Sequence, residues 1–215
     1  MVRQILMALS VVAVAAATIA RAHSVWIEPS GSNQLVVRFA EPGDAFETSP
    51  GYLDNLSTPI AFIFATNAPL ATETQRKSDH FLLVGASPTN VACVETSFIV
   101  RGGRKPYFYA RWQPPGTGAA KPLLTLDLVP TDKTGEVRAW FRGKPLGGVA
   151  ATLRAPDDKE QELTTDSEGF LHFNANEPGQ YLLTISHYRE PLAGFHVGIA
   201  YKETSHNCSL VWQRP

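Results

Sequence analysis

The sequence predicts an all-β fold, with two β-sandwich units of the Ig-like or prealbumin-like type following a cleaved signal peptide. Short runs rich in Val, Ile, Phe, Tyr and Thr recur along the chain, and Gly- and Pro-containing turns separate them. This pattern is typical of sandwiches and barrels. No segment shows convincing helical periodicity, and only 45–56 leaves room for a short helical turn or a long loop.

The amino terminus has the three parts of a secretory signal. Arg3 gives a basic start, 5–20 carry no charge, and Ala20-Arg21-Ala22 form a small-residue cleavage site. The alternative is a membrane anchor, but the uncharged run of 16 residues is shorter than the roughly 20 that span a bilayer. We therefore expect cleavage after Ala22, export to the periplasm, a mature chain that begins at His23, and no stable membrane insertion.

Turn residues divide the rest of the chain into elements. A turn-rich stretch at 130–135 predicts a linker between an N-terminal unit, 23–130, and a C-terminal unit, 136–215. The strands expected in the first unit are 25–28, 34–39, 60–65, 80–84, 91–100, 107–112 and 123–129. Those expected in the second are 137–141, 149–153, 170–173, 181–185 and 208–212.

Charge and motifs exclude several classes of function. The chain carries 19 Lys and Arg against 20 Asp and Glu side chains, without the basic stripe of a nucleic-acid binder. It contains no G-x-S-x-G elbow, no P-loop and no dinucleotide fingerprint. Acidic pairs such as Glu41 and Asp44 occupy turn-like stretches and are expected to be solvated. We therefore expect a binding protein rather than an enzyme.

The two cysteines, Cys93 and Cys208, are far apart in sequence. An oxidising compartment favours a disulfide between them. The alternative is two buried free thiols. No C-x-x-C spacing suggests a metal site.

Cleavage after Ala22 would place His23 at the free amino terminus. Such a residue offers the α-amine and the imidazole in one chelate, and the α-amine loses its proton far more readily than lysine. Imidazole nitrogen suits copper, nickel, zinc and cobalt. His23 is therefore the main candidate ligand for a divalent transition metal.

A second group of candidate ligands lies near the carboxyl terminus, at strand ends where loops present side chains. His187, His196, His206 and Glu203 form this group. No H-x-x-x-H pair is present, so each of these residues taken alone also fits an ordinary surface or capping role. We expect His187 and His206, with Glu203 or His196, to complete a metal site if these loops fold back toward His23.

The opening Ala22-His23-Ser24-Val25-Trp26-Ile27-Glu28-Pro29 resembles the mature start of the DUF4198 family. The motifs at 143–149, 165–169 and 178–181 are similar to the carboxyl-terminal half of that family. Its members are described as periplasmic components of nickel and cobalt uptake systems. The resemblance implies binding of Ni²⁺ or Co²⁺ with His23 as a ligand, and an inner-membrane metal transporter as partner. The affinity order and the amine–imidazole chelate also favour Cu²⁺.

Two other functions remain open on the sequence. A copper mono-oxygenase would use an amino-terminal His with one further His as a brace around the metal. A non-metal Ig-like binding or adhesion module would use its strand edges or tryptophans, although tryptophans more often lie in the core.

Overall fold

The computed structural model describes residues 22–31, 33–64, 68–117 and 120–215, and it confirms the all-β prediction. The predicted signal peptide spans residues 1–22. Residues 1–21 of it lie outside the described part of the chain, and only Ala22 lies within it. One short 3₁₀ helix, η1 (Tyr52–Asn55), occupies the segment that left room for a helical turn. Within the described residues, no helix has the length and apolar character needed to cross a membrane.

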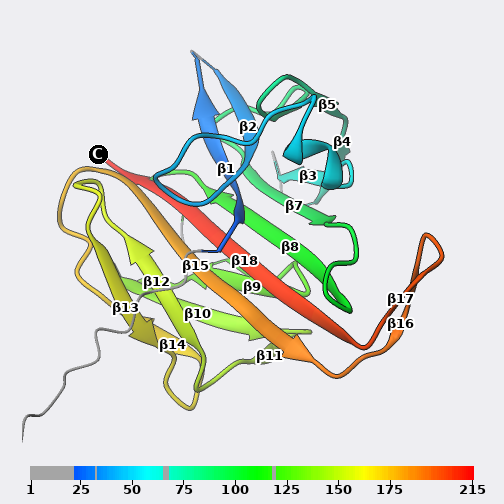
Figure 1. Cartoon of the computed structure of the whole chain (residues 1–215). Helices are drawn as coiled ribbons and strands as arrows, with labels where there is room; N and C mark the ends of the chain where they lie inside the picture. The colour runs from blue at the N-terminus through cyan, green and yellow to red at the C-terminus, as the bar shows by residue number, and fades with distance from the viewer. Residues whose placement is uncertain (1–21, 32, 65–67, 118–119) are drawn as a thin grey trace, which may run out of the picture.

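A large central sheet runs through the molecule (Figure 1). Its strands, in spatial order, are β13 (Glu160–Thr164), β12 (Ala150–Arg154), β15 (Gly179–Glu190), β18 (Glu203–Arg214), β8 (Arg104–Gln113), β7 (Val91–Ser97), β3 (Ile60–Phe64) and β4 (Leu70–Thr72). β18 pairs with β8 in parallel and with β15 antiparallel. The last strand of the chain therefore lies between the two halves of the sequence.

Two smaller sheets pack on the central one. The first contains β1 (Ser24–Ser30), β2 (Gln34–Ala40), β6 (Phe81–Leu83) and β5 (Thr74–Arg76). The second contains β11 (Lys144–Pro145), β10 (Glu136–Phe141) and β14 (Phe170–His172), with β9 (Leu126–Pro130) paired to β10. A separate hairpin, β16 (Gly194–His196) and β17 (Ile199–Tyr201), projects from the end of the long strands β15 and β18 (Figure 1).

The small sheets cover opposite faces of the central sheet, because successive side chains of a strand point to opposite faces. On β8, Phe108, Ala110 and Trp112 join a core with β1, β2 and β6, and we call that side the first face. Tyr109 of the same strand joins a core with β9, β10 and β14, on what we call the second face. The predicted boundary at 130–135 lies between β9 and β10, and strands from both sides of it share the central sheet.

The disulfide favoured by the sequence is wrong, because Cys93 and Cys208 are both free and buried. Cys93 on β7 pairs in register with Arg111 of β8, whereas Cys208 on β18 pairs with Tyr109 of β8. One whole strand separates them, which places β7 and β18 roughly 10 Å apart. A disulfide requires Cα atoms within about 7 Å. Burial raises the pKa of Cys93 to about 12, so its thiol stays protonated.

Candidate functional site

His23 lies directly before β1, and the sheet register explains its neighbours. Ser24 pairs with Ala40 at the end of the β1–β2 hairpin, so the next positions, His23 and Glu41, lie side by side. The loop after β2 then folds back, because the N–H of Glu47 donates to the carbonyl of Phe39 at 3.0 Å. This return brings a second carboxylate to the same histidine.

Both ring nitrogens of His23 face carboxylates. Nε2 lies 2.6 Å from Oε1 of Glu47, and Nδ1 lies 3.5 Å from Oε1 of Glu41. In the neutral ring, an Nε2–H that donates to Glu47 leaves the Nδ1 lone pair toward Glu41. A carboxylate on the distal nitrogen commonly orients a metal-binding imidazole in this way. Phe39 and Tyr52 flank the ring, each with a centroid separation of 5.1 Å.

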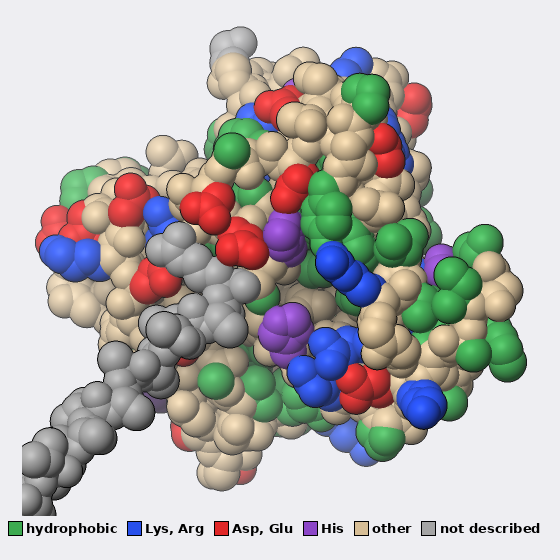
Figure 2. Space-filling view, in the orientation of Figure 1, with side chains coloured by type: hydrophobic (Ala, Val, Ile, Leu, Met, Phe, Trp, Pro, Cys, Tyr) green, Lys and Arg blue, Asp and Glu red, His purple; other side chains and the backbone are tan. Residues whose placement is uncertain are grey.

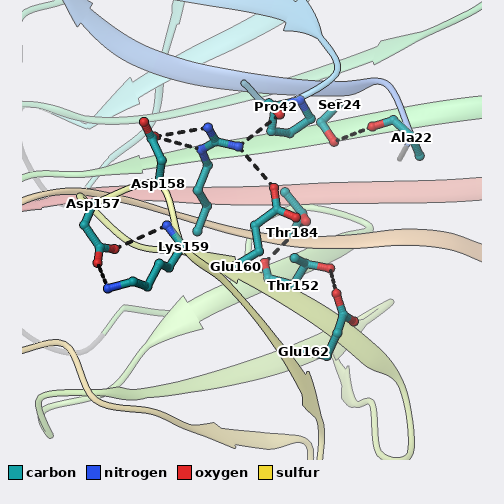
Figure 3. A network of polar contacts seen from close by, with 11 residues as sticks. Ala22, Ser24, Pro42, Thr152, Asp157, Asp158, Lys159, Glu160, Glu162 and Thr184 are labelled. Atoms are coloured by element: carbon teal, nitrogen blue, oxygen red, sulfur yellow. Dashed lines mark hydrogen bonds and ion pairs between the residues drawn. The ribbon is translucent and has the colours of Figure 1, made fainter. Parts of the chain in front are cut away.

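Arg154 of β12 holds the carboxylate-bearing loop from the other side. Its Nη1 donates to the carbonyl of Pro42 at 3.0 Å, and the same guanidinium contacts Asp158 and Glu160. Figure 3 labels these three partners around the guanidinium. Gly43 leaves the room for it, since a Cβ there would lie 2.6 Å from the guanidinium. The position of Glu41 thus depends on a strand far away in the sequence.

His187 reaches the same region through a β-bulge. The register of β15 against β18 shifts between Ile185 and Tyr188, and His187 has a φ of 60°. Its backbone N–H donates to Oδ1 of Asn207 at 2.9 Å. A bulge redirects a side chain, and here His187 joins His23 in lining a cavity of about 270 Å³ on the first face. Desolvation, then the charges of Arg104 and Arg189, lower the pKa of His187.

His206 lies on the second face of the central sheet, away from His23. It is buried, and its Nδ1 pairs with the hydroxyl of Tyr109 at 3.0 Å. Its Nε2 is 3.0 Å from Oε2 of Glu190 and 3.2 Å from the hydroxyl of Thr204. Both ring nitrogens of His206 are thus engaged within the fold. Because His206 lies on the opposite face of the central sheet, the structure does not bring it together with His23.

The other two predicted ligands also lie apart from His23. Glu203 pairs with Arg104 at 2.6 Å and with Arg189 at 4.0 Å. His196 lies on β16 of the projecting hairpin, where burial and Lys105 lower its pKa. Neither side chain lines the cavity that His23 and His187 share.

The donor set around His23 fits a transition metal only when the α-amine is counted. Across the described ranges, no group of three or more His, Cys, Asp and Glu side chains could hold a metal ion. His23 and Glu41 supply one imidazole and one carboxylate, and signal cleavage would add the amine. Glu41 and Glu47 were not predicted as site residues from the sequence, because carboxylates in turns are usually solvated. The usable signal was the β1–β2 hairpin register, which places residues 23 and 41 side by side when it is continued by one position.

Comparisons with known proteins identify no relative of this chain, so the functional argument depends on the fold and the site. No protein-family model matches this chain, and no curated protein matches it.

Proposed function

We propose that the exported protein begins at His23, binds one divalent transition-metal ion there, and handles that metal in the periplasm. The α-amine and Nδ1 of His23 would form the chelate, Glu41 would add a carboxylate, and Glu47 would orient the ring. The observation that carries the proposal is the pair of carboxylates at the two ring nitrogens, at 2.6 and 3.5 Å.

The donor chemistry narrows the choice of metal. Two nitrogens and one carboxylate suit borderline ions such as Ni²⁺, Co²⁺ and Cu²⁺, whereas Mg²⁺ and Ca²⁺ prefer oxygen alone. Uptake of nickel or cobalt, with delivery to an inner-membrane transporter, is the role that the motif resemblance favours. The affinity order for nitrogen-rich sites favours copper.

Calorimetric titration of the protein that begins at His23 tests the proposal with NiCl₂, CoCl₂ and CuCl₂. We expect one-to-one binding of at least one of these ions. A matched protein acetylated at the amine of His23 keeps every side chain but replaces the amine with an amide. The proposal requires much weaker binding by this acetylated form, and equal binding by both forms would contradict it.

A copper mono-oxygenase is the second candidate, and the cavity shared by His23 and His187 is the observation that favours it. Such an enzyme needs a second imidazole at the metal, and His187 is the other histidine that lines this cavity within the described residues. Peroxide-driven oxidation of polysaccharide by the copper-loaded protein, lost in His187→Ala, would support it. Metal binding without that oxidation would exclude the mono-oxygenase and would support metal binding as the function.

A further inference from the structure

The cavity beside His23 has an aromatic wall and a cationic part. Phe39, Tyr52, Phe98 and Phe108 line it together with Arg101 and Arg104. Figure 2 shows a hollow on this face, with one histidine beside Asp and Glu side chains and another beside Lys and Arg side chains. At about 270 Å³, the cavity is slightly smaller than the roughly 300–1,000 Å³ typical of sites for drug-sized ligands, which fits a small molecule.

Ser205 of β18 supplies a polar group without a partner in this cavity wall. It is 1% exposed, and its Oγ makes no hydrogen bond within the described part of the chain. Its neighbours on the same face differ: Ser209 donates to the carbonyl of Val25, and the Asn207 amide donates to that of Tyr107. Buried hydroxyls are normally paired, so an orphan that lines a cavity needs an explanation.

Arg104 provides the charge next to this hydroxyl. In the parallel pairing of β18 with β8, Arg104 is opposite Glu203 and Pro106 is opposite Ser205. The side chains of Arg104 and Ser205 are therefore diagonal neighbours on one face of the sheet. The Nε of Arg104 donates to Glu203 at 2.6 Å. Within the described residues, this leaves its Nη groups for another acceptor. An arginine fork matches the geometry of a carboxylate.

We propose that this cavity binds a small organic carboxylate, with its carboxylate at Arg104 and Ser205 and its apolar body against Phe98 and Phe108. The aromatic wall favours an organic acid over inorganic phosphate or sulfate, which have no apolar body to bury. The site requires neither the amine nor the metal at His23, so it goes beyond the proposed function.

Titration of the chelator-treated protein with benzoate, 3-phenylpropionate and hexanoate tests the proposal, with benzamide as the neutral match to benzoate. We expect saturable binding of at least one acid, and binding of benzamide about tenfold weaker than that of benzoate or undetectable. The protein acetylated at the amine of His23 should bind these acids equally well. Failure of metal binding and failure of acid binding are therefore separate results.

Ser205→Ala distinguishes a ligand site from a fold defect. Removing an unpaired buried hydroxyl should leave the melting temperature unchanged or raise it, whereas acid affinity should fall about tenfold. Arg104→Gln should weaken binding at least as much. Arg189→Gln is the control, since Arg189 approaches the same Glu203 but does not line the cavity.

Three results would overturn the proposal. One is no saturable binding of any of the acids at millimolar concentration, and another is equal binding of benzoate and benzamide. The third is unchanged acid affinity in Ser205→Ala, which would mean that water alone satisfies the hydroxyl.

Discussion

Glu47→Gln separates a metal-orienting role of Glu47 from a purely structural one. The substitution keeps the size of the side chain and an oxygen that can accept from Nε2 of His23, but it removes the negative charge. The His23 and Glu47 side chains are 28% and 27% exposed, with 2.6 Å between Nε2 and Oε1. A partly exposed pair of this kind contributes about 1 kcal/mol or less to stability. For a chain of this length, that corresponds to a melting shift of no more than about 2–4 °C.

The expected effect on metal binding is much larger. Loss of a carboxylate that orients a metal-binding imidazole typically lowers affinity about 10- to 100-fold, or roughly 1.4–2.7 kcal/mol. Competition titration against a chromophoric chelator measures the change in the protein that begins at His23. Glu162→Gln is the matched control, because Glu162 lies on β13, away from His23. Within the described chain, its side chain accepts a hydrogen bond only from the hydroxyl of Thr152 (Figure 3). Equal metal affinity in the two variants would refute the orienting role.

Three further predictions concern the fold itself. Asp127→Asn should destabilise the protein by about 3–5 kcal/mol in urea unfolding, because it leaves the buried Arg111 without its charge partner; a loss below about 1 kcal/mol would contradict this. The two cysteine thiols should react with iodoacetamide only after denaturation, and a reductant should leave the melting temperature unchanged; rapid alkylation of the native protein would count against the buried free thiols. Burial lowers the pKa of His206 below its ordinary 6.5, and Glu190 offsets only part of this. The unfolded chain therefore takes up the proton first, so stability should fall as the pH drops below about 6.5 and should fall less in His206→Gln; identical pH profiles would exclude this contribution.

The fold class could be predicted from the sequence because strand and turn signals are local. The stretches 34–39 and 137–141 lie entirely within β2 and β10 as observed. The pairing of β18 with β8 could not be predicted, because parallel strands so distant in sequence leave no local signal. That pairing also explains why the two cysteines form no disulfide, since it places β8 between Cys93 and Cys208.

Of the proposed metal-binding set, His23, Glu41 and Glu47, only His23 was predictable from the sequence. His23 follows from the cleavage motif, but its carboxylate partners depend on the hairpin register and on a loop that Arg154 holds. His187 and His206 look equivalent in sequence, yet the bulge sends His187 to the first face whereas His206 stays on the second. A one-residue shift in a strand reverses which face a side chain occupies.

The coordination of Cu²⁺ in the protein that begins at His23 is the direct test of the amine–imidazole chelate. Electron paramagnetic resonance with nitrogen hyperfine analysis distinguishes amine from imidazole ligands. We expect one amine nitrogen and one imidazole nitrogen; His23→Ala should remove the imidazole nitrogen, and acetylation of the His23 amine should remove the amine nitrogen. Two imidazole nitrogens, or no amine nitrogen, would contradict a chelate formed by His23 alone.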